Sequence, residues 1–322
     1  MRIIFSLFLL CCLLTNGTAQ QKSFEGVIDY QLEAKSKNPW ISDVSIARLL
    51  AIASTMKVHI KQGNFRRESA KMLDINRTDS NRQLFMFKGI DTFYYNAPAV
   101  TEEEIPEISQ SEKIVTIAGY NCKSLTIRSK NMITTYYYDP ALFQDPAYSN
   151  PADKTSFTLF LKQTKAVYLK CVIETEQFVY TETAFRVAKT TVADAVFQLQ
   201  SFPVAEFVFM SHLKLPVFKS GDEAEWVSYV QKSINADLVN KYVKIPKGEK
   251  AAQQTAEVLF VVLANGTVGE AEVINKKEIH AALAKEAVRI VKESFGWKPA
   301  TVRGEKIDQL MMQKITFRIA EE

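Results

Sequence analysis

The sequence is short of the residues that most often build reactive centres. Its 322 residues include only four cysteines and three histidines, and two of the cysteines lie within the first twenty residues. The three histidines, His59, His212 and His280, are far apart and form no His-x-x-x-His pair. Cys-x-x-Cys pairs, Gly-x-Ser-x-Gly elbows and phosphate-binding loops are also missing. We therefore predict a protein that is not an enzyme, with no catalytic residues, no metal site and no cofactor.

The net charge is also low. The chain has 40 lysines and arginines and 36 aspartates and glutamates, which gives +4. A nucleic-acid-binding protein usually carries a strongly basic face, so this balance argues against such a partner. Hydrophobic residues make up 47% and charged residues 24% of the chain, which is typical of a globular protein. The length favours two domains.

Long apolar runs are missing apart from one at the N-terminus. Ile3 to Leu14 is a twelve-residue apolar run after a basic start, and a membrane-spanning helix needs about 20 residues. Small residues follow, with Gly17 and Ala19 at the positions that a signal peptidase prefers. We predict a signal peptide over residues 1–19, cleavage before Gln20, and an exported mature chain without an integral membrane segment.

The first half of the mature chain has the pattern of an antiparallel sheet. Alternating apolar residues separated by turn signals predict many short strands, and one helix is expected at Asp43–Ser54 with Ser42 as a possible N-cap. The Pro-rich stretch from Tyr138 to Ser156 is either a lid or a long connection. The expected strands are Phe24–Gln31, Met56–Lys61, Phe65–Ser69, Met72–Asn76, Gln83–Lys88, Thr92–Asn96, Ile114–Ile117, Ile117–Arg128, Ile133–Asp139, Val167–Thr175 and Ala184–Lys189.

Two cysteines remain in the mature chain, Cys122 and Cys171, and an exported protein permits a disulfide between them. We expect them on two strands that are separated in sequence by the strand Ile133–Asp139. In a meander that strand also separates them in space, so their Cα atoms lie farther apart than the roughly 7 Å limit for a disulfide. A different strand order would allow the bond; otherwise both are small buried apolar residues.

Tyrosines are dense on the expected strands. Tyr94, Tyr136 and Tyr138 either line a cavity for an apolar ligand or form cross-strand pairs within the core. Neighbouring residues of a strand point to opposite faces, so both interpretations can hold in one sheet.

This half resembles the LolA-like half-barrel domains of the secreted Bacteroidetes type. The resemblance covers about residues 22 to 203 and is carried by Phe-Glu-Gly-Val-Ile-Asp-Tyr from Phe24, by Met-Lys-Val-His-Ile-Lys-Gln-Gly-Asn-Phe-Arg-Arg-Glu from Met56, and by Ile-Ala-Gly-Tyr-Asn-Cys-Lys-Ser from Ile117. It implies a curved sheet whose concave face is partly closed by helices. Such a face can hold an acyl chain or a lipoprotein segment.

The second half predicts a small α+β unit. Helices are expected at Gly221–Ser233 and Glu278–Glu293, and Asn265-Gly266 marks a hairpin between two strands. The segment from Lys244 to Gln254 is polar and loop-like. The expected strands are Glu257–Leu263, Thr267–Ile274 and Ile307–Ile319. The order is helix, strand, strand, helix, strand, and the fold class of the whole chain is α+β.

That order resembles the C-terminal domain of TonB-type energy transducers. Its motifs are Gly-Asp-Glu-Ala-Glu-Trp from Gly221, Asn265-Gly266, Glu-Ala-Val from Glu286, Trp-Lys-Pro-Ala from Trp297 with the following Gly304, and Ile-Thr-Phe from Ile315. The family often has Tyr-Pro where this chain has Ile245-Pro246. The sequence thus predicts a half-barrel domain at 20–203, a linker at 204–220 and a TonB-like domain at 221–320.

The resemblance implies that the last strand lies at a sheet edge and accepts a strand from an envelope or outer-membrane protein. We predict that the docking residues are Leu310, Met311, Met312, Lys314 and Ile315. Alternatively, Met311 and Met312 are ordinary strand positions, one of them in the core. A complete transducer also needs an uncleaved membrane helix and a Pro-rich spacer. Coupling to the membrane gradient by this chain alone is therefore not expected.

Three hypotheses for the function follow. The first is a binding or adaptor protein, either free in the periplasm or associated with the outer membrane, that docks partner strands and serves envelope transport. The second is a carrier or chaperone that holds a lipid, an acyl chain or a lipoprotein segment in the half-barrel. The third is a structural envelope protein without a ligand.

Overall fold

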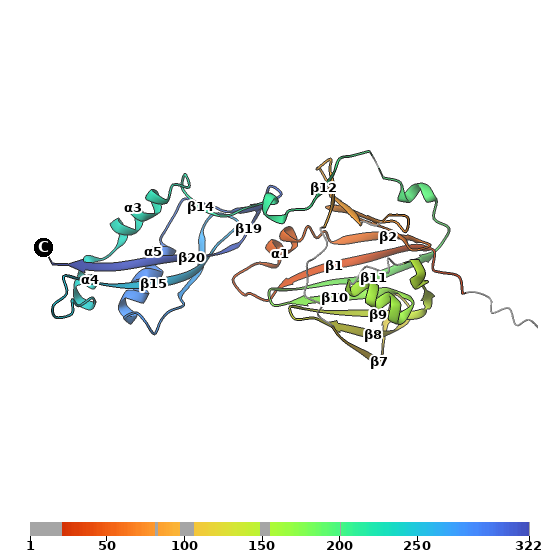
Figure 1. Cartoon of the computed structure of the whole chain (residues 1–322), viewed down its shortest axis with the longest axis horizontal. Coiled ribbons are helices and arrows are strands. Elements are labelled where there is room, and N and C mark those ends of the chain that lie inside the picture. The colour runs from red at the N-terminus through yellow and green to blue at the C-terminus, as the bar shows by residue number, and fades with distance from the viewer. Residues whose placement is uncertain (1–20, 81–82, 97–105, 149–154, 200, 322) are drawn as a thin grey trace, which may run out of the picture.

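The computed structural model describes residues 21–80, 83–96, 106–148, 155–199 and 201–321. The predicted signal peptide of residues 1–19 lies outside the described residues. The strands form two separate groups, a large sheet from the first half of the chain and a small α+β unit from the second (Figure 1). The predicted α+β fold class with a large antiparallel sheet is confirmed.

The large sheet has twelve strands in the order β12-β6-β5-β4-β3-β2-β1-β11-β10-β9-β8-β7. Each pair of neighbouring strands in it is antiparallel except β12 with β6. The strands are β1 (Gly26–Ser36), β2 (Thr55–Lys61), β3 (Asn64–Ser69), β4 (Met72–Asn76), β5 (Leu84–Phe87), β6 (Phe93–Tyr95), β7 (Glu107–Ile117), β8 (Tyr120–Arg128), β9 (Met132–Phe143), β10 (Ala166–Thr175), β11 (Phe178–Lys189) and β12 (Val204–Glu206).

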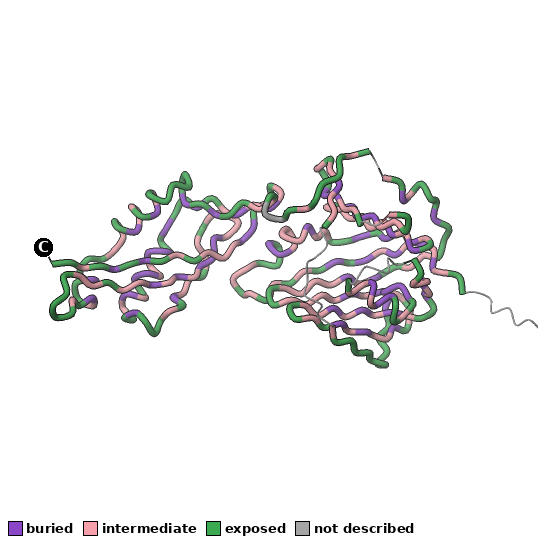
Figure 2. Tube along the Cα trace, in the orientation of Figure 1, coloured by how far each residue is buried: buried purple, intermediate pink, exposed green. Residues whose placement is uncertain are grey.

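One face of this sheet carries the main core, as the alternation of the strands predicts. Along β1, Ile28, Tyr30 and Leu32 are buried while Gln31 and Glu33 are exposed. Helix α2 (Ser156–Thr164) packs on this face through residues such as Phe160. Figure 2 shows the resulting alternation of buried and exposed residues along the strands. We call this face the inner face.

The opposite face is partly covered, from β2 to β6, by the segment that follows β11. Leu73 and Ile75 of β4 form a small buried cluster with Met86 and Phe93, and Phe202 packs against it from the segment after β11. That segment contains the short 3-10 helix η2 (Asp194–Phe197). Its backbone carbonyls accept hydrogen bonds from the Lys61 ammonium at 2.9 Å and the Arg66 guanidinium at 3.1 Å. The segment is therefore fixed to the back of the sheet.

In the first half of the chain, the helices differ from the sequence prediction at two places. Helix α1 (Asp43–Leu49) has the predicted N-cap, since the Ser42 hydroxyl accepts a hydrogen bond from the Ser45 amide, but it ends at Leu49 because Ala51 adopts a positive φ. Helix α2 was not expected, and the Thr155 hydroxyl caps it. The predicted loop from Tyr138 is strand up to Phe143, followed by the 3-10 helix η1 (Pro146–Tyr148); residues 149–154 lie outside the described part.

The stretch between the two groups is hydrogen-bonded to both of them. Strand β12 joins the large sheet, the 3-10 helix η3 (Phe209–His212) follows, and β13 (Leu213–Lys214) and β14 (Val217–Phe218) pair with strands of the C-terminal unit. Residues 204–220, predicted as a linker, thus connect the large sheet with the strands of the C-terminal unit.

The C-terminal unit has a three-stranded antiparallel sheet in the order β16-β15-β20, with helices packed on it (Figure 1). Helix α4 and the short strands β17, β18 and β19 were not predicted, and the first residues of β15 fall in the predicted polar loop. The elements are α3 (Glu223–Ser233), α4 (Ala236–Tyr242), β15 (Ala251–Val262), β16 (Val268–Val273), α5 (Ala281–Lys292), β17 (Trp297–Lys298), β18 (Ala300–Val302), β19 (Glu305–Ile307) and β20 (Gln309–Ala320).

The core of this unit is built around aromatic residues. Phe218, Trp226 and Trp297 are mutually in contact, with ring centres 5.2 to 5.4 Å apart. The Trp297 indole donates to the Ser294 hydroxyl at 2.8 Å, so its polar atom is satisfied inside the core. At the predicted hairpin, Gly266 has φ +86°, and a Cβ there would lie 2.6 Å from the Trp297 carbonyl oxygen. Only glycine fits this turn without moving the backbone.

Candidate functional site

Strand β20 forms one edge of the C-terminal sheet. All twelve of its residues are paired with β15, from Gln309 opposite Val262 to Ala320 opposite Ala251. No other described strand pairs with it. In an antiparallel strand with a neighbour on one side only, alternate N–H and C=O groups point away from the sheet. These groups can hydrogen-bond to an added strand.

The five predicted docking residues have different environments. Met312 is 51% exposed, and Lys314 is exposed with its ammonium 3.0 Å from the Glu257 carboxylate. Leu310 and Met311 are half-buried, and Met311 packs against the core. Ile315 is 0% exposed, so its side chain belongs to the core and only its backbone lies along the edge. Of the two methionines, Met311 is thus the one that faces the core.

The three predicted ligand-cavity tyrosines do not lie together. Tyr136 and Tyr138 are buried on β9 beneath α2, where the Tyr136 ring stacks on Phe160 with ring centres 4.5 Å apart. The Tyr136 hydroxyl is 3.0 Å from the Ser156 hydroxyl. Tyr94 is half-buried on β6, in a separate aromatic group near the C-terminal unit. Two of the three are therefore packed in the core under a helix.

The aromatic group around Tyr94 lies where the two units meet. Phe85, Phe87 and Tyr94 from the large sheet contact Phe207 and His212 from the connecting stretch, with the His212 ring stacked on Phe207 at 5.3 Å. Burial, followed by the neighbouring guanidinium of Arg303, lowers the pKa of His212. The imidazole therefore behaves as a neutral aromatic ring in this group.

The C-terminal unit holds both ends of helix α1. At the N-terminal end, one Asp308 carboxylate oxygen accepts from the Ser42 amide at 3.0 Å and the Ser42 hydroxyl at 2.5 Å. The other oxygen accepts from the Ala264 amide at 2.8 Å, and the Asp308 amide donates to the Ser45 hydroxyl at 2.7 Å. All these groups are within hydrogen-bonding distance, so the carboxylate is well satisfied although Asp308 is buried.

At the C-terminal end of α1, the Arg303 guanidinium donates to the carbonyl oxygens of Arg48 and Leu49 at 2.5 and 2.9 Å. Its guanidinium carbon also lies 4.5 Å from the centre of the Phe87 ring. An anion at the start of a helix and a cation at its end both complement the helix dipole. Arg303 lies in the turn between β18 and β19, and Asp308 directly follows β19. We call the contact of these two residues with α1 the α1 clamp.

Further contacts support the α1 clamp. The Lys71 ammonium is 2.6 Å from one Glu305 carboxylate oxygen, and the Arg48 guanidinium donates to the Lys306 carbonyl at 2.7 Å. Leu49 packs against a small apolar cluster of the hairpin that includes Val302. The two units are therefore joined by a built interface as well as by the chain itself.

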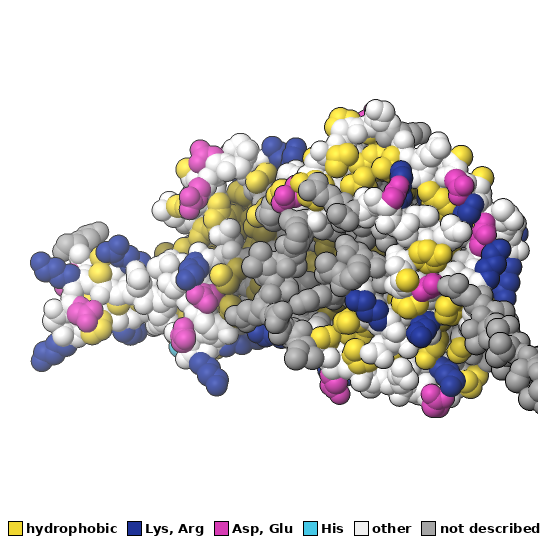
Figure 3. All heavy atoms as spheres, turned by 45° about the vertical axis from the view of Figure 1, so that its right-hand side comes forward, with side chains coloured by type: hydrophobic (Ala, Val, Ile, Leu, Met, Phe, Trp, Pro, Cys, Tyr) yellow, Lys and Arg dark blue, Asp and Glu magenta, His cyan; other side chains and the backbone are white. Residues whose placement is uncertain are grey.

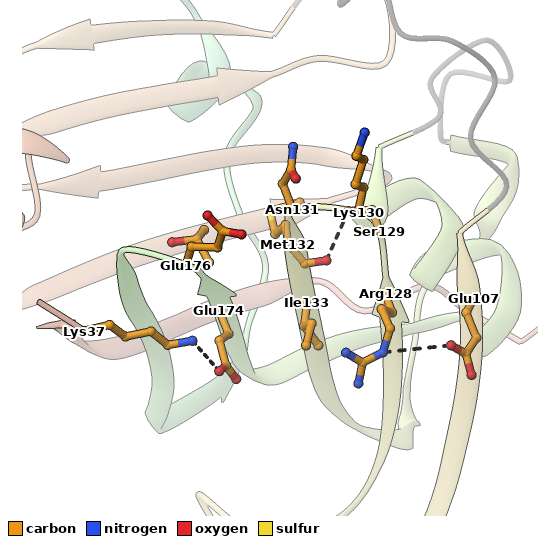
Figure 4. Close-up of a pocket in the computed structure, with 11 residues that line it drawn as sticks. Lys37, Glu107, Arg128, Ser129, Lys130, Asn131, Met132, Ile133, Glu174 and Glu176 are labelled. Carbon is orange, nitrogen blue, oxygen red and sulfur yellow. Dashed lines mark hydrogen bonds and ion pairs between the residues drawn. The ribbon is translucent and has the colours of Figure 1, made fainter. Parts of the chain in front are cut away.

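A polar pocket opens at one end of the large sheet, around the β8–β9 and β10–β11 turns (Figure 4). It has a volume of about 520 Å³. Two ion pairs line it: Lys37 with Glu174 at 2.5 Å and Arg128 with Glu107 at 3.9 Å. Positive and negative side chains balance each other in this pocket, and both ion pairs are largely exposed. The pocket therefore offers a ligand little electrostatic binding energy.

The two mature cysteines are both free and buried. Cys122 lies on β8 and Cys171 on β10, and β9 separates these strands in the sheet. Burial raises the pKa of the Cys122 thiol to about 11. Both residues therefore behave as small apolar core residues rather than as reactive thiols.

Metal ligands do not gather in the described part of the chain: it has no group of three or more His, Cys, Asp or Glu residues that could hold a metal ion. Among the described helices, none is long and apolar enough to cross a membrane. The surface in Figure 3 carries dispersed Lys, Arg, Asp and Glu side chains with apolar side chains between them.

Sequence reasoning missed the α1 clamp. Ser42 was identified as a cap, but its second partner, Asp308, is 266 residues away. Arg303 and Asp308 had no signal of their own, because a charged residue beside a turn usually points into solvent. These two residues form hydrogen bonds to α1 only because the fold places the β18–β19 hairpin against this helix.

Comparison with known proteins identifies the C-terminal sheet. Residues 248–319 match the family of Gram-negative bacterial TonB protein C-terminal domains. The TonB C-terminal domain predicted from the Trp-Lys-Pro-Ala turn and the last strand is thus supported over β15 to β20. The matched segment is less than half of the chain.

Solved structures align with the chain only at low similarity. Two structures of PNGF-II align with 74% and 73% of this chain at 12% and 9% identity, with TM-scores of 0.35 and 0.34. The chain spans only 43% and 42% of those proteins. A crystal structure of MucB in complex with MucA(peri) aligns with 86% of this chain and 93% of its own, at 10% identity and a TM-score of 0.28. A search among curated proteins found no match. The LolA-like resemblance therefore stays a prediction.

Proposed function

We propose that this protein is an exported adaptor of the Gram-negative envelope that docks an extended segment of a partner protein along β20. The periplasm is the proposed location, with association to the outer membrane through the partner. The observation that carries the proposal is the one-sided pairing of β20 over twelve residues. The family match over residues 248–319 supports a partner interaction in the envelope.

The charged side chains of β20 limit unspecific strand pairing at this sheet edge. Lys314 and Arg318 place positive charge beside the backbone groups, and such charges discourage indiscriminate strand pairing. Met312 provides an exposed, flexible apolar contact on the same strand. A partner segment with an acidic residue and an apolar residue two positions apart would complement Met312 and Lys314, since alternate residues share a face.

Site-specific photo-crosslinking tests this proposal. A photoreactive amino acid at Met312 in the periplasmically expressed chain should crosslink to an envelope protein. The same amino acid at Phe295, which is 72% exposed and lies after α5, is the matched control. Crosslinks should be mapped by mass spectrometry to an extended segment of the partner. Equal crosslinking at both positions, or none at Met312, would overturn the proposal.

A second candidate function is a carrier or chaperone of a lipid, an acyl chain or a lipoprotein segment. The observation that favours it is the inner face of the large sheet, which carries aromatic residues from several strands and from α2. Native mass spectrometry and lipid extraction of the purified protein test it. A bound acyl-chain species would support the carrier, whereas an empty protein that also fails to crosslink at Met312 would favour a structural envelope protein.

A further inference from the structure

Four lysines follow one another at the far end of the C-terminal unit. Lys241 lies in the last turn of α4, and Lys244, Lys247 and Lys250 lie in the stretch between α4 and β15. All four side chains are exposed. This stretch is at the end of the molecule that points away from the large sheet (Figure 1). We call residues 241–250 the basic tip.

The surroundings of the basic tip leave it positively charged. Glu249 is the one acid within it, and among the described residues no acidic side chain forms an ion pair with its four lysines. By contrast, Lys276 of the same unit lies 3.0 Å from the Glu272 carboxylate. Near the tip, Arg318 of β20 adds one cation and Glu321 adds one carboxylate. Figure 3 shows more Lys and Arg than Asp and Glu side chains at this end of the molecule.

The fold holds both ends of the basic tip. The Gln254 side-chain amide donates to the Tyr242 carbonyl at 3.1 Å, and Val243 is buried in the core of the unit. At the other end, the Glu321 amide donates to the Lys250 carbonyl at 2.9 Å. The lysines are therefore presented on an anchored turn, and their charges stay together on one surface.

We propose that the basic tip binds the headgroups of an anionic lipid surface. A lysine ammonium is a compact charge on a flexible stem, and it does not match one anion in the two-bonded geometry that arginine allows. Four such charges on a turn suit many dispersed phosphates better than one small ligand. Each lysine near an anionic bilayer raises the affinity about fivefold. Pro246, exposed between two of the lysines, adds a small apolar contact.

The composition of the tip favours a lipid surface over an acidic protein. Protein interfaces are enriched in arginine and aromatic residues and depleted in lysine. The basic tip has four lysines and no arginine, and its one aromatic residue, Tyr242, is stacked on His280 with ring centres 4.1 Å apart. A lysine cluster alone gives reversible binding, so the protein would exchange between the surface and solution. This contact is separate from the docking of a partner along β20.

Cosedimentation of the mature chain with lipid vesicles tests the proposal. Vesicles of phosphatidylglycerol and phosphatidylcholine in equal parts should bind the protein at about 50 mM salt, and about 500 mM salt should release it, because salt screens exposed charges. Vesicles of phosphatidylcholine alone should not bind it. Absence of binding to the anionic vesicles, or equal binding to the two compositions, would overturn the proposal.

Two double variants with the same net charge provide the matched comparison. Lys244→Gln combined with Lys247→Gln should weaken binding to the anionic vesicles at least about tenfold. Lys214→Gln combined with Lys298→Gln removes the same charge from exposed positions on β13 and β17, and this variant should bind as the wild type does. Equal weakening in both would show an effect of net charge alone and would overturn the role of the tip.

Hydrogen exchange on the wild type locates the contact without a variant. Amides of residues 243–250 should gain protection on anionic vesicles, whereas amides of β20 around Met312 should not. Protection confined to other segments would overturn the proposal. Soluble polyglutamate at the same concentration of negative charge should leave the protein on the vesicles. Release by polyglutamate would assign the tip to an acidic protein and overturn the lipid assignment.

The lipid contact and the docking of a partner can fail separately. The variant with Lys244→Gln and Lys247→Gln should still crosslink through a photoreactive amino acid at Met312. Lost vesicle binding with retained crosslinking is the expected result. Loss of both in this variant would show that the tip acts on the docking edge and would overturn its separate role.

Discussion

Two arginines differ sharply in their surroundings, one in the α1 clamp and one on the inner face of the large sheet. Arg303 lies in the α1 clamp, where its donors bond to the carbonyls of Arg48 and Leu49. Arg67 lies on the inner face of the large sheet, where its donors meet no described partner. A buried cation is costly unless it is paired, so the first arginine is explained by the fold and the second is not. The α1 clamp is thus a charge that the fold satisfies, whereas Arg67 is a charge that no described hydrogen bond or ion pair satisfies.

The largest effect is expected at Asp308. Asp308→Ala removes a buried carboxylate that accepts from three donors, at Ser42 and Ala264. Leaving these donors unsatisfied should lower the free energy of unfolding by about 3 kcal/mol, as measured by urea denaturation. Asp79→Ala is the control, because Asp79 is an exposed partner of Arg77, and this change should have little effect. A loss below about 1 kcal/mol in Asp308→Ala would show that the clamp is not a structural contact.

A smaller loss is expected at the other end of α1. Arg303→Met keeps the apolar stem near Phe87 but removes the two bonds to the helix carbonyls. We expect a loss of about 2 kcal/mol, since hydrogen bonds to charged groups contribute about 1.5–3 kcal/mol. Hydrogen exchange should show the loss first in the amides of α1. Unchanged protection of α1 would mean that the helix is held by packing against the sheet instead.

The clamp should also respond to acid. Burial acts to raise the pKa of Asp308, but hydrogen bonds from Ser42, Ala264 and Ser45 outweigh it and lower the pKa below the usual value. A depressed pKa stabilises the folded state above the unfolded pKa of about 3.9, and this stability is lost as the pH falls through the lower folded value. Amide protection of α1 should therefore drop as the pH falls below the unfolded value of about 3.9 and through the lower folded pKa. In Asp308→Asn that step should be absent.

The smallest effect on stability, and one of different sign, is expected at Arg67. Arg67→Leu replaces an unpaired, half-buried charge with an apolar side chain among aromatic residues. Such replacements are often neutral or stabilising, so the free energy of unfolding should change by no more than about 1 kcal/mol or increase slightly. Thermal denaturation of Arg67→Leu beside Arg303→Met measures the contrast directly. A large loss in Arg67→Leu would make Arg67 a structural residue and remove the distinction between the two regions.

Much of the local structure could be predicted from the sequence. The strands Met56–Lys61, Phe65–Ser69 and Met72–Asn76 follow from alternating apolar residues, and the Asn265-Gly266 turn follows from the backbone that only glycine allows. Helix α2 was missed because Pro140, Pro146 and Pro151 precede it closely and made the whole region look like a loop. Its apolar residues are explained by the sheet that they cover.

The candidate sites were less predictable, because they depend on which strands become neighbours. Met312 and Ile315 look alike in the sequence, but one is exposed and the other is in the core. Tyr136 and Tyr138 were expected to line a cavity as readily as the core, and the position of α2 buries both. Arg67 gave no signal, because an arginine in a strand with polar neighbours is usually exposed.

The sequence by itself determined the periodicities, the turns and the caps, since these depend on residues a few positions apart. It also carried the TonB-like motifs of β15 to β20, whose spacing is local. Only the tertiary structure decided that Asp308 meets Ser42 and that Arg67 faces Tyr168, because these pairs are 266 and 101 positions apart and their contacts arise from sheet order and from the docking of one unit on the other. Long-range electrostatic partners have no periodic pattern, so they become visible only once the chain is folded.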